Sequence, residues 1–108
     1  TMWLFTNTGF VSAVSNGTDL MVRSRDRESL EPLAESAETK ILSTPQNDYP
    51  YRVIVTHEIF SRWVARMATG ITYKNFKSEV SATRGYDFAH PLMKVWSVMH
   101  DVQNLSKG

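Results

Sequence analysis

The sequence predicts a small α+β domain, with an antiparallel sheet of about four strands and helices packed on one face. Two observations lead to this class. β-Branched and aromatic residues dominate the first half and are interrupted by a hairpin signal, whereas the second half shows apolar residues at helical spacing. The predicted order is β-β-α-β-β-α-α-α, for which a sheet with helices on one side is the simplest packing. We expect residues 1–108 to form a single globular domain.

The first two strands are predicted on either side of an Asn-Gly turn. Residues 3–14 are rich in β-branched and aromatic side chains. Asn16 and Gly17 follow, and this dipeptide favours a tight hairpin because both residues tolerate positive φ. Residues 20–25 then return as the second strand, with apolar and basic side chains alternating between its faces.

A helix, a short strand and a loop are predicted next. Apolar residues at positions i, i+3, i+4 and i+7, counted from Leu30, predict a helix. Ser29 is its expected N-cap, and Pro32 is expected in its first turn. Residues 40–43 are a candidate strand. Residues 44–50 are dense in turn-forming residues, which predicts a loop.

A strand-helix pair is predicted after this loop. Residues 51–56 place an apolar side chain at every second position, as a half-buried strand does. Thr56 is the expected cap of the following helix, and Gly70 is expected to end it.

Two further helices complete the predicted fold. The first spans residues 73–82 with Thr72 as its cap, and Asp87 is the expected cap of the second, with Pro91 in or just after its first turn. If the apolar stripe of this last helix is too large for one small core, its side chains form a dimer seam. The stripe contains Leu92, Val95, Trp96, Met99 and Val102.

Composition excludes several classes of protein. The chain has no cysteine, which excludes a disulfide scaffold, a Cys-ligated zinc and a thiol nucleophile. Residues 1–50 hold four basic and seven acidic residues and residues 51–108 hold eight and four, so the halves carry −3 and +4 and the chain carries +1. This balance excludes a uniformly cationic surface but permits a local cationic patch. With no signal peptide and no window of about 20 apolar residues, we expect a cytoplasmic protein with no membrane partner.

The histidines do not form a recognisable metal-binding or catalytic motif. His57, His90 and His100 lack metal-ligand spacing, so no metal and no cofactor is expected. His57 and Glu58 can form an acid/base pair at a helix start, but the simpler interpretation is that both are ordinary residues of a first helical turn.

Arginine and tyrosine side chains form the main candidate binding surface. Arg23 and Arg25 lie on one strand face, roughly 7 Å apart from strand rise, which suits adjacent phosphates or two carboxylates. If Arg52 is on a neighbouring strand, three guanidinium groups share a sheet face, and Tyr49 and Tyr51 are candidates to stack on bases. The alternative is a solvated face whose arginines pair with acidic side chains of the first helix. These are Glu28, Glu31, Glu35 and Glu38.

Several strings resemble a family of small uncharacterised bacterial and phage-associated proteins. They read MWxxTxxGFxSxV from residue 2, LMVRSR from 20, TPxxDYPYR from 44, YxNFK from 73 and VWSVM from 95. The resemblance implies no activity, cofactor or catalytic residue. It does imply that polar positions around these strings form a shared surface. They are Arg23, Arg25, Asp48, Tyr49, Tyr51, Arg52, Lys74, Asn75 and Lys77.

Three functions are compatible with these observations. The first is a non-enzymatic binding or regulatory module with a protein or nucleic-acid partner, and a phage-type inhibitor of a nucleic-acid-targeting host system fits this size. The second is a small enzyme acting on phosphate esters or nucleotides, with His57 or His90 as acid/base and Asp48 or Glu58 nearby. The third is a homodimer joined through the late-helix aromatic residues. The lack of a complete catalytic set favours the binding module.

Overall fold

The computed structural model describes residues 1–105 and has the predicted α+β fold. The chain divides into two compact units, Thr1–Thr72 and Tyr73–Gly108. The first unit contains the whole sheet and two helices, and the second contains the last two helices. Among residues 1–105, no helix combines the length and apolarity needed to cross a bilayer.

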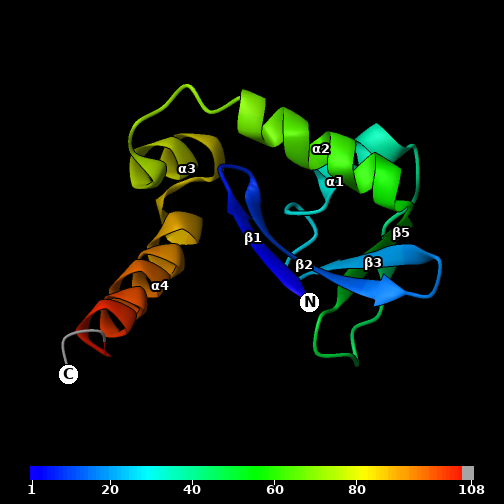
Figure 1. The fold of residues 1–108 in the computed structure, drawn as a ribbon, viewed down its shortest axis with the longest axis horizontal. Helices are drawn as coiled ribbons and strands as arrows, with labels where there is room; N and C mark the ends of the chain where they lie inside the picture. The colour runs from blue at the N-terminus through cyan, green and yellow to red at the C-terminus, as the bar shows by residue number, and fades with distance from the viewer. Residues whose placement is uncertain (106–108) are drawn as a thin grey trace. The chain divides into compact units, whose positions relative to one another are not determined.

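The sheet has five strands in the order β1-β2-β3-β5-β4, and every neighbouring pair is antiparallel (Figure 1). This is one strand more than the sequence predicts. The strands are β1 (Met2–Thr6), β2 (Gly9–Asn16), β3 (Asp19–Ser24), β4 (Leu42–Ser43) and β5 (Tyr51–Val55).

The additional strand arises because the predicted strand over residues 3–14 is in fact a hairpin. Thr6 pairs with Gly9, and the chain reverses between them. The Thr6 hydroxyl accepts a hydrogen bond from the Thr8 backbone N–H at 3.2 Å. The same hydroxyl donates a hydrogen bond to the Gly9 carbonyl at 3.3 Å. A side chain therefore stabilises this turn, and β1 folds back on β2.

The second hairpin forms where the sequence predicts it, displaced by one residue. Asn16 pairs with Asp19, and Asn16 also donates a side-chain hydrogen bond to the Asp19 carboxylate. The two turn residues are therefore Gly17 and Thr18. Gly17 has φ +75°, which a glycine adopts without strain at the first central position of a tight hairpin.

Helix α1 (Glu31–Ala37) begins later than predicted and lacks the expected cap. Its N-cap is Leu30, and no side chain caps it. Ser29 instead donates to the Asp26 carboxylate and accepts from the Phe10 backbone N–H, so its hydroxyl joins α1 to the sheet. The helix ends at Glu38, which has φ +52°.

Helix α2 (His57–Thr69) has the predicted ends. The Thr56 hydroxyl accepts a hydrogen bond from the Ile59 N–H at 3.1 Å, and Gly70 is the C-cap. Phe60 and Trp63 lie on its buried side, with ring centroids 5.9 Å apart.

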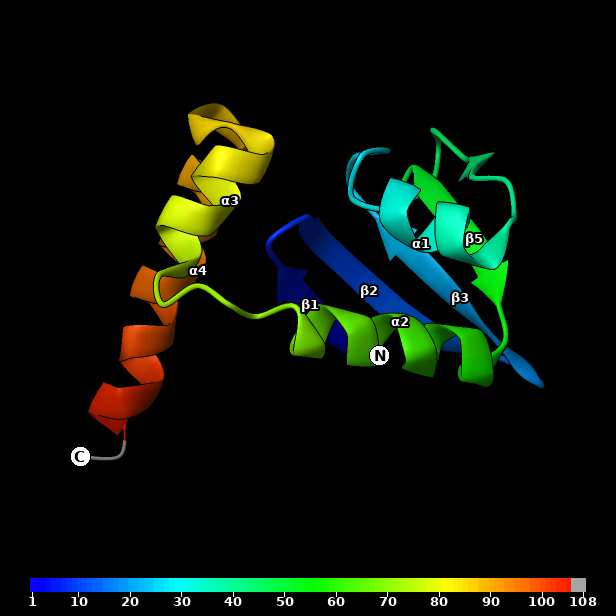
Figure 2. The same ribbon diagram turned by 90° about the horizontal axis from the view of Figure 1, so that it is seen from above.

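The hydrophobic core lies between the two helices and one face of the sheet. Figures 1 and 2 show α1 and α2 on the same side of the strands. Alternate residues of β2, β3 and β5 point to this side, which we call the covered face, and the other side of the sheet is the open face. The buried side chains of the core are Val11, Ala13, Val22, Leu30, Leu33, Ala34, Val53, Val55, Phe60 and Trp63.

In the second unit, α3 (Phe76–Arg84) and α4 (Tyr86–Leu105) pack against each other. The expected cap of α3, Thr72, is wrong, because the Asn75 carboxamide oxygen accepts the Ser78 N–H at 2.9 Å. The expected cap of α4 is also displaced. Asp87 is already inside its first turn, whereas Pro91 lies just after that turn, as predicted.

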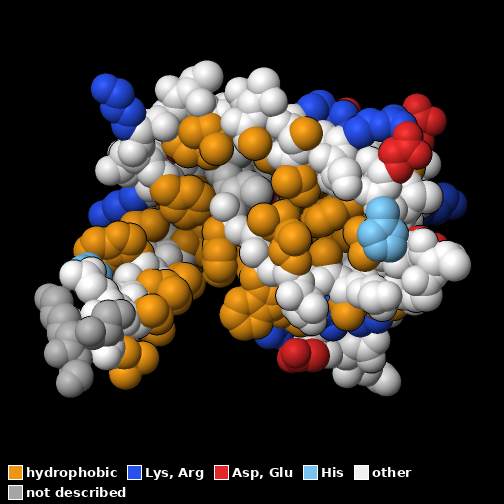
Figure 3. Space-filling model, in the orientation of Figure 1, with side chains coloured by type: hydrophobic (Ala, Val, Ile, Leu, Met, Phe, Trp, Pro, Cys, Tyr) orange, Lys and Arg blue, Asp and Glu red, His pale blue; other side chains and the backbone are white. Residues whose placement is uncertain are grey.

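Helix α4 is much longer than its neighbour α3. With 20 and nine residues, the helices span about 30 Å and about 14 Å. Hydrophobic side chains remain exposed along α4, as the space-filling view shows (Figure 3). The expected homodimer through them stays a prediction. The exposed set is Tyr86, Trp96, Val98, Met99, Val102 and Leu105.

Candidate functional site on the open face of the sheet

One row of paired residues crosses the open face from edge to edge. The register pairs Trp3 with Ser12, Ser12 with Arg23, Arg23 with Arg52, and Arg52 with Leu42. Directly opposed residues on antiparallel strands project to the same side. Arg23 and Arg52 therefore share the face that α1 and α2 leave uncovered, as the strand alternation predicts.

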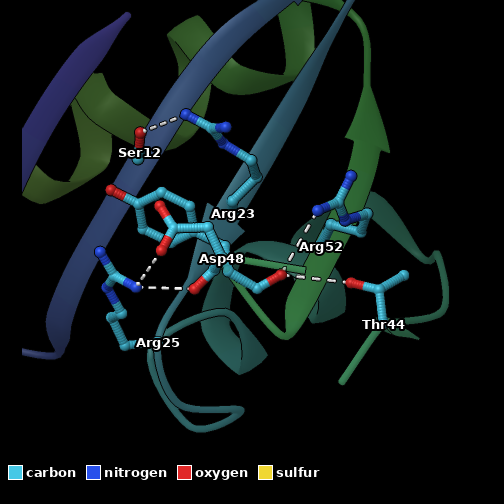
Figure 4. Close-up of polar contacts among 7 residues, drawn as sticks. Ser12, Arg23, Arg25, Thr44, Asp48 and Arg52 are labelled. Carbon is cyan, nitrogen blue, oxygen red and sulfur yellow. Dashed lines mark hydrogen bonds and ion pairs between the residues drawn. The ribbon is translucent and has the colours of Figure 1, made fainter. Parts of the chain in front are cut away.

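Tyr49 organises two of the arginines. Tyr49 is 6% exposed, and the guanidinium carbons of Arg23 and Arg25 lie 4.5 and 4.3 Å from its ring centroid. Arg25 also donates to the Asp48 carboxylate at 3.1 Å and to the Asp48 carbonyl at 2.6 Å, as the close-up shows (Figure 4). Arg23 donates to the Ser12 hydroxyl at 2.9 Å. Tyr49 is therefore a support for these arginines and has no free ring face of the kind that base stacking needs.

Arg52 holds the loop over residues 44–50 against the sheet. Its guanidinium donates to the Tyr49 carbonyl at 3.3 Å and contacts the Met21 sulfur at 3.0 Å. The Thr44 hydroxyl donates to the same Tyr49 carbonyl at 3.2 Å, and the Thr44 N–H donates to the Pro50 carbonyl at 2.7 Å. These bonds close the loop and place Asp48 and Tyr49 beside the arginines.

Arg23 and Arg52 carry charges that no carboxylate of residues 1–105 balances in an ion pair. Among residues 1–105, neither forms an ion pair; Arg25 pairs with Asp48 instead. Both are partly buried, and the Nε atom of each is inaccessible to solvent and has no hydrogen-bond partner. Like charges directly opposite each other on neighbouring strands are destabilising. The open face thus contains a cationic pair that an anion would stabilise.

Three aromatic rings lie on the same face of the sheet as this cationic pair. Phe5 pairs with Phe10 in the register, and their rings stack with centroids 4.6 Å apart. Trp3 meets Phe10 edge to face at 6.0 Å. Trp3 is 63% exposed and Phe5 39% exposed, so both offer ring surface to a ligand.

A surface depression connects Trp3 to Arg23. Trp3, Arg23, Asp48 and Tyr49 line it together with Thr1. The indole and the Arg23 guanidinium therefore face one space, which we call the Trp3–Arg23 depression. Sequence reasoning missed the aromatic part. Trp3 and Phe5 are two residues apart in a strand, and that spacing alone places both on one face.

The remaining predicted site residues are Tyr51 and three residues of the second unit. Tyr51 is on the covered face, where it packs against the core. Lys74, Asn75 and Lys77 belong to the second unit, and the Asn75 side chain caps α3 by bonding Ser78. Their membership of a surface shared with Arg23 stays a prediction.

The carboxylates expected to assist catalysis have other partners. Asp48 pairs with Arg25, and Glu58 pairs with Arg62 one helical turn away. His57 is the first residue of α2, which packs on the covered face, on the other side of the sheet from the arginine pair.

The other two histidines contact aromatic rings in the second unit. His90 lies near the Tyr86 ring, with centroids 5.7 Å apart, and His100 meets Trp96 edge to face at 4.5 Å. Within residues 1–105, no group of three His, Cys, Asp or Glu side chains is arranged to hold a metal ion.

The predicted acidic partners of the arginines are also on the wrong side. Helix α1, which carries Glu31 and Glu35, packs on the covered face, whereas Arg23 and Arg52 project from the open face. The sheet separates the two sets. Glu31 and Glu35 are therefore not partners of Arg23 or Arg52, and a solvated arginine face stays a prediction.

Comparison with known proteins gave no match to a family model, a curated protein or a solved structure. The function is therefore inferred from the geometry of the open face.

Proposed function

We propose that the chain is a non-enzymatic binding module that holds a partner macromolecule against the open face of its sheet. The observation that carries this proposal is the combination of exposed, mutually packed rings with the unbalanced Arg23–Arg52 pair on one face. Contiguous exposed apolar surface on a small protein is typical of an interaction site. Tryptophan, tyrosine and arginine are also the residues that contribute most to binding energy at interfaces.

The rigidity of this surface supports the same proposal. Tyr49 and Ser12 hold the Arg23 side chain, and Phe10 supports the rings of Trp3 and Phe5. Side chains that are already ordered lose less conformational entropy when a partner binds. The open face is therefore suited to recognition without rearrangement.

Site-specific photo-crosslinking tests the proposal without assuming a partner. Phe5 is replaced by p-benzoylphenylalanine, and a matched variant carries it at Ser61, which is exposed on α2. After irradiation in cells that express the chain naturally, we expect a covalent adduct from position 5 and little from position 61. Mass spectrometry then identifies the adduct as protein or nucleotide. No adduct from position 5, or equal adducts from both positions, contradicts the proposal.

A further inference from the structure

We infer that the partner of the open face is an unpaired nucleic-acid strand, an inference that rests on the function proposed above. The ligand must satisfy two chemistries on one face of the sheet. The Arg23–Arg52 pair calls for an anion, and the exposed rings of Trp3 and Phe5 call for a flat apolar group. Trp3 and Arg23 supply one of each within a single depression. A nucleic-acid strand presents phosphates and bases side by side at every repeat.

Arg23 suits a phosphate in geometry as well as charge. A guanidinium group has five N–H donors in a planar fork that matches phosphate oxygens. One nitrogen of Arg23 is used by Ser12 and its Nε is buried, while Tyr49 fixes the plane of the group. The remaining donors are presented by a side chain that is already held in place.

The aromatic rings suit bases that are not paired. Trp3 and Phe5 are two residues apart on β1, roughly 7 Å by strand rise, and point to the same side. Successive bases of an extended strand can each contact one ring. In a duplex the base faces are stacked inside, so exposed rings on a sheet gain nothing from them. The net charge of +1 also disfavours duplex binding, which relies on many phosphate contacts.

Binding of labelled oligothymidylate and oligouridylate at low and physiological salt tests the inference. We expect binding that weakens as salt rises, because phosphate contacts release counterions. Trp3→Ala should weaken binding by about tenfold or more, since one base loses its stacking partner. Arg23→Gln should reduce the slope of log affinity against log salt by roughly 0.7, the value for one phosphate contact on a single strand.

Matched variants show whether binding takes place on the open face. Trp96→Ala removes an equally exposed tryptophan from the second unit and should leave the affinity unchanged. If Arg23→Gln does not fold, Phe5→Ala serves as a second variant of the open face. Phe5 lies at the surface, so we expect this variant to fold and to weaken binding as Trp3→Ala does. Thermal unfolding followed by circular dichroism confirms that each variant is folded.

The outcomes distinguish the inference from the proposed function. Absence of oligonucleotide binding, or equal loss with Trp3→Ala and Trp96→Ala, overturns the nucleic-acid inference. If position 5 then crosslinks to a protein, the open face is a protein-binding surface and the proposed function stands. If position 5 gives no adduct and no oligonucleotide binds, both fail.

Discussion

Trp63 and Trp96 occupy different environments and should differ in their contribution to stability. Trp63 is 3% exposed and packs beside Phe60, whereas Trp96 is 67% exposed. Truncating a buried tryptophan costs about 3–5 kcal/mol, and most surface substitutions change stability by about 0.5 kcal/mol or less. We expect Trp63→Ala to lower the free energy of unfolding by about 3–5 kcal/mol. Trp96→Ala should change it by less than about 1 kcal/mol, as measured by urea denaturation.

A large loss of stability in Trp96→Ala would contradict the exposed position of this side chain. Comparing the two variants at several protein concentrations adds a second readout. The urea midpoint of the unaltered chain would rise with protein concentration if the chain forms the predicted homodimer, because association stabilises only the folded chain. Loss of this dependence in Trp96→Ala would support a dimer that is joined through this side chain.

At the level of single residues, the sequence predicts faces better than partners. Strand alternation correctly assigns Arg23 and Arg52 to one face. It does not show that Tyr49 is enclosed by two guanidinium groups or that Asp48 pairs with Arg25. Both contacts depend on how the loop over residues 44–50 folds back on the sheet, and no local pattern encodes that path.

Among the elements, helix α2 has an N-cap whose energy can be measured. The Thr56 hydroxyl accepts the Ile59 N–H, one of the first-turn donors that has no partner inside the helix. We expect Thr56→Ala to lower the free energy of unfolding by about 1 kcal/mol. Thr69→Ala is the matched control at the other end of the helix, where the hydroxyl donates to a carbonyl already in the helical turn. The control should be nearly neutral.

Denaturant titrations of the two threonine variants give the comparison directly. Equal destabilisation by both substitutions would show that the cap hydrogen bond contributes nothing particular to α2. A larger loss in Thr56→Ala than in Thr69→Ala confirms the role that the sequence assigns to Thr56.

The element that the sequence misses is the hairpin between β1 and β2. Its turn residues, Asn7 and Thr8, keep negative φ, whereas the usual sequence signals mark turns that need positive φ. The turn is held by the Thr6 hydroxyl instead. Continuous β-forming residues on both sides therefore look like one long strand.

The cap of α3 shows a different limit. Thr72 and Asn75 are both good cap residues, and they are three positions apart, close to one helical turn. A helix that begins after either residue would have nearly the same apolar face. The structure uses Asn75, and periodicity alone cannot distinguish the two choices.

For the whole molecule, the division into two units predicts where a protease cuts. Lys74 is exposed between α2 and α3, outside any helix or strand. Every side chain of the main core lies within Thr1–Thr72. We expect limited trypsin digestion to cut after Lys74, because this residue lies in an exposed segment at the boundary between the two units.

The fragment spanning residues 1–74 should keep its strand content and unfold cooperatively. Circular dichroism of the purified fragment measures this. The control is the same digest before its two fragments are separated. A fragment that loses its structure would show that the sheet and its two helices depend on the second unit for stability.

The position of β1 at the border of the sheet has a consequence for handling the protein. Along its outer side, the N–H and C=O groups of this strand have no neighbouring strand among residues 1–105, and Met2–Thr6 contains no charge and no proline. Natural proteins usually protect such borders with lysine, proline or very short strands, as the two-residue β4 does on the opposite side. The exposed edge of β1 is therefore a site at which we expect aggregation in concentrated solution.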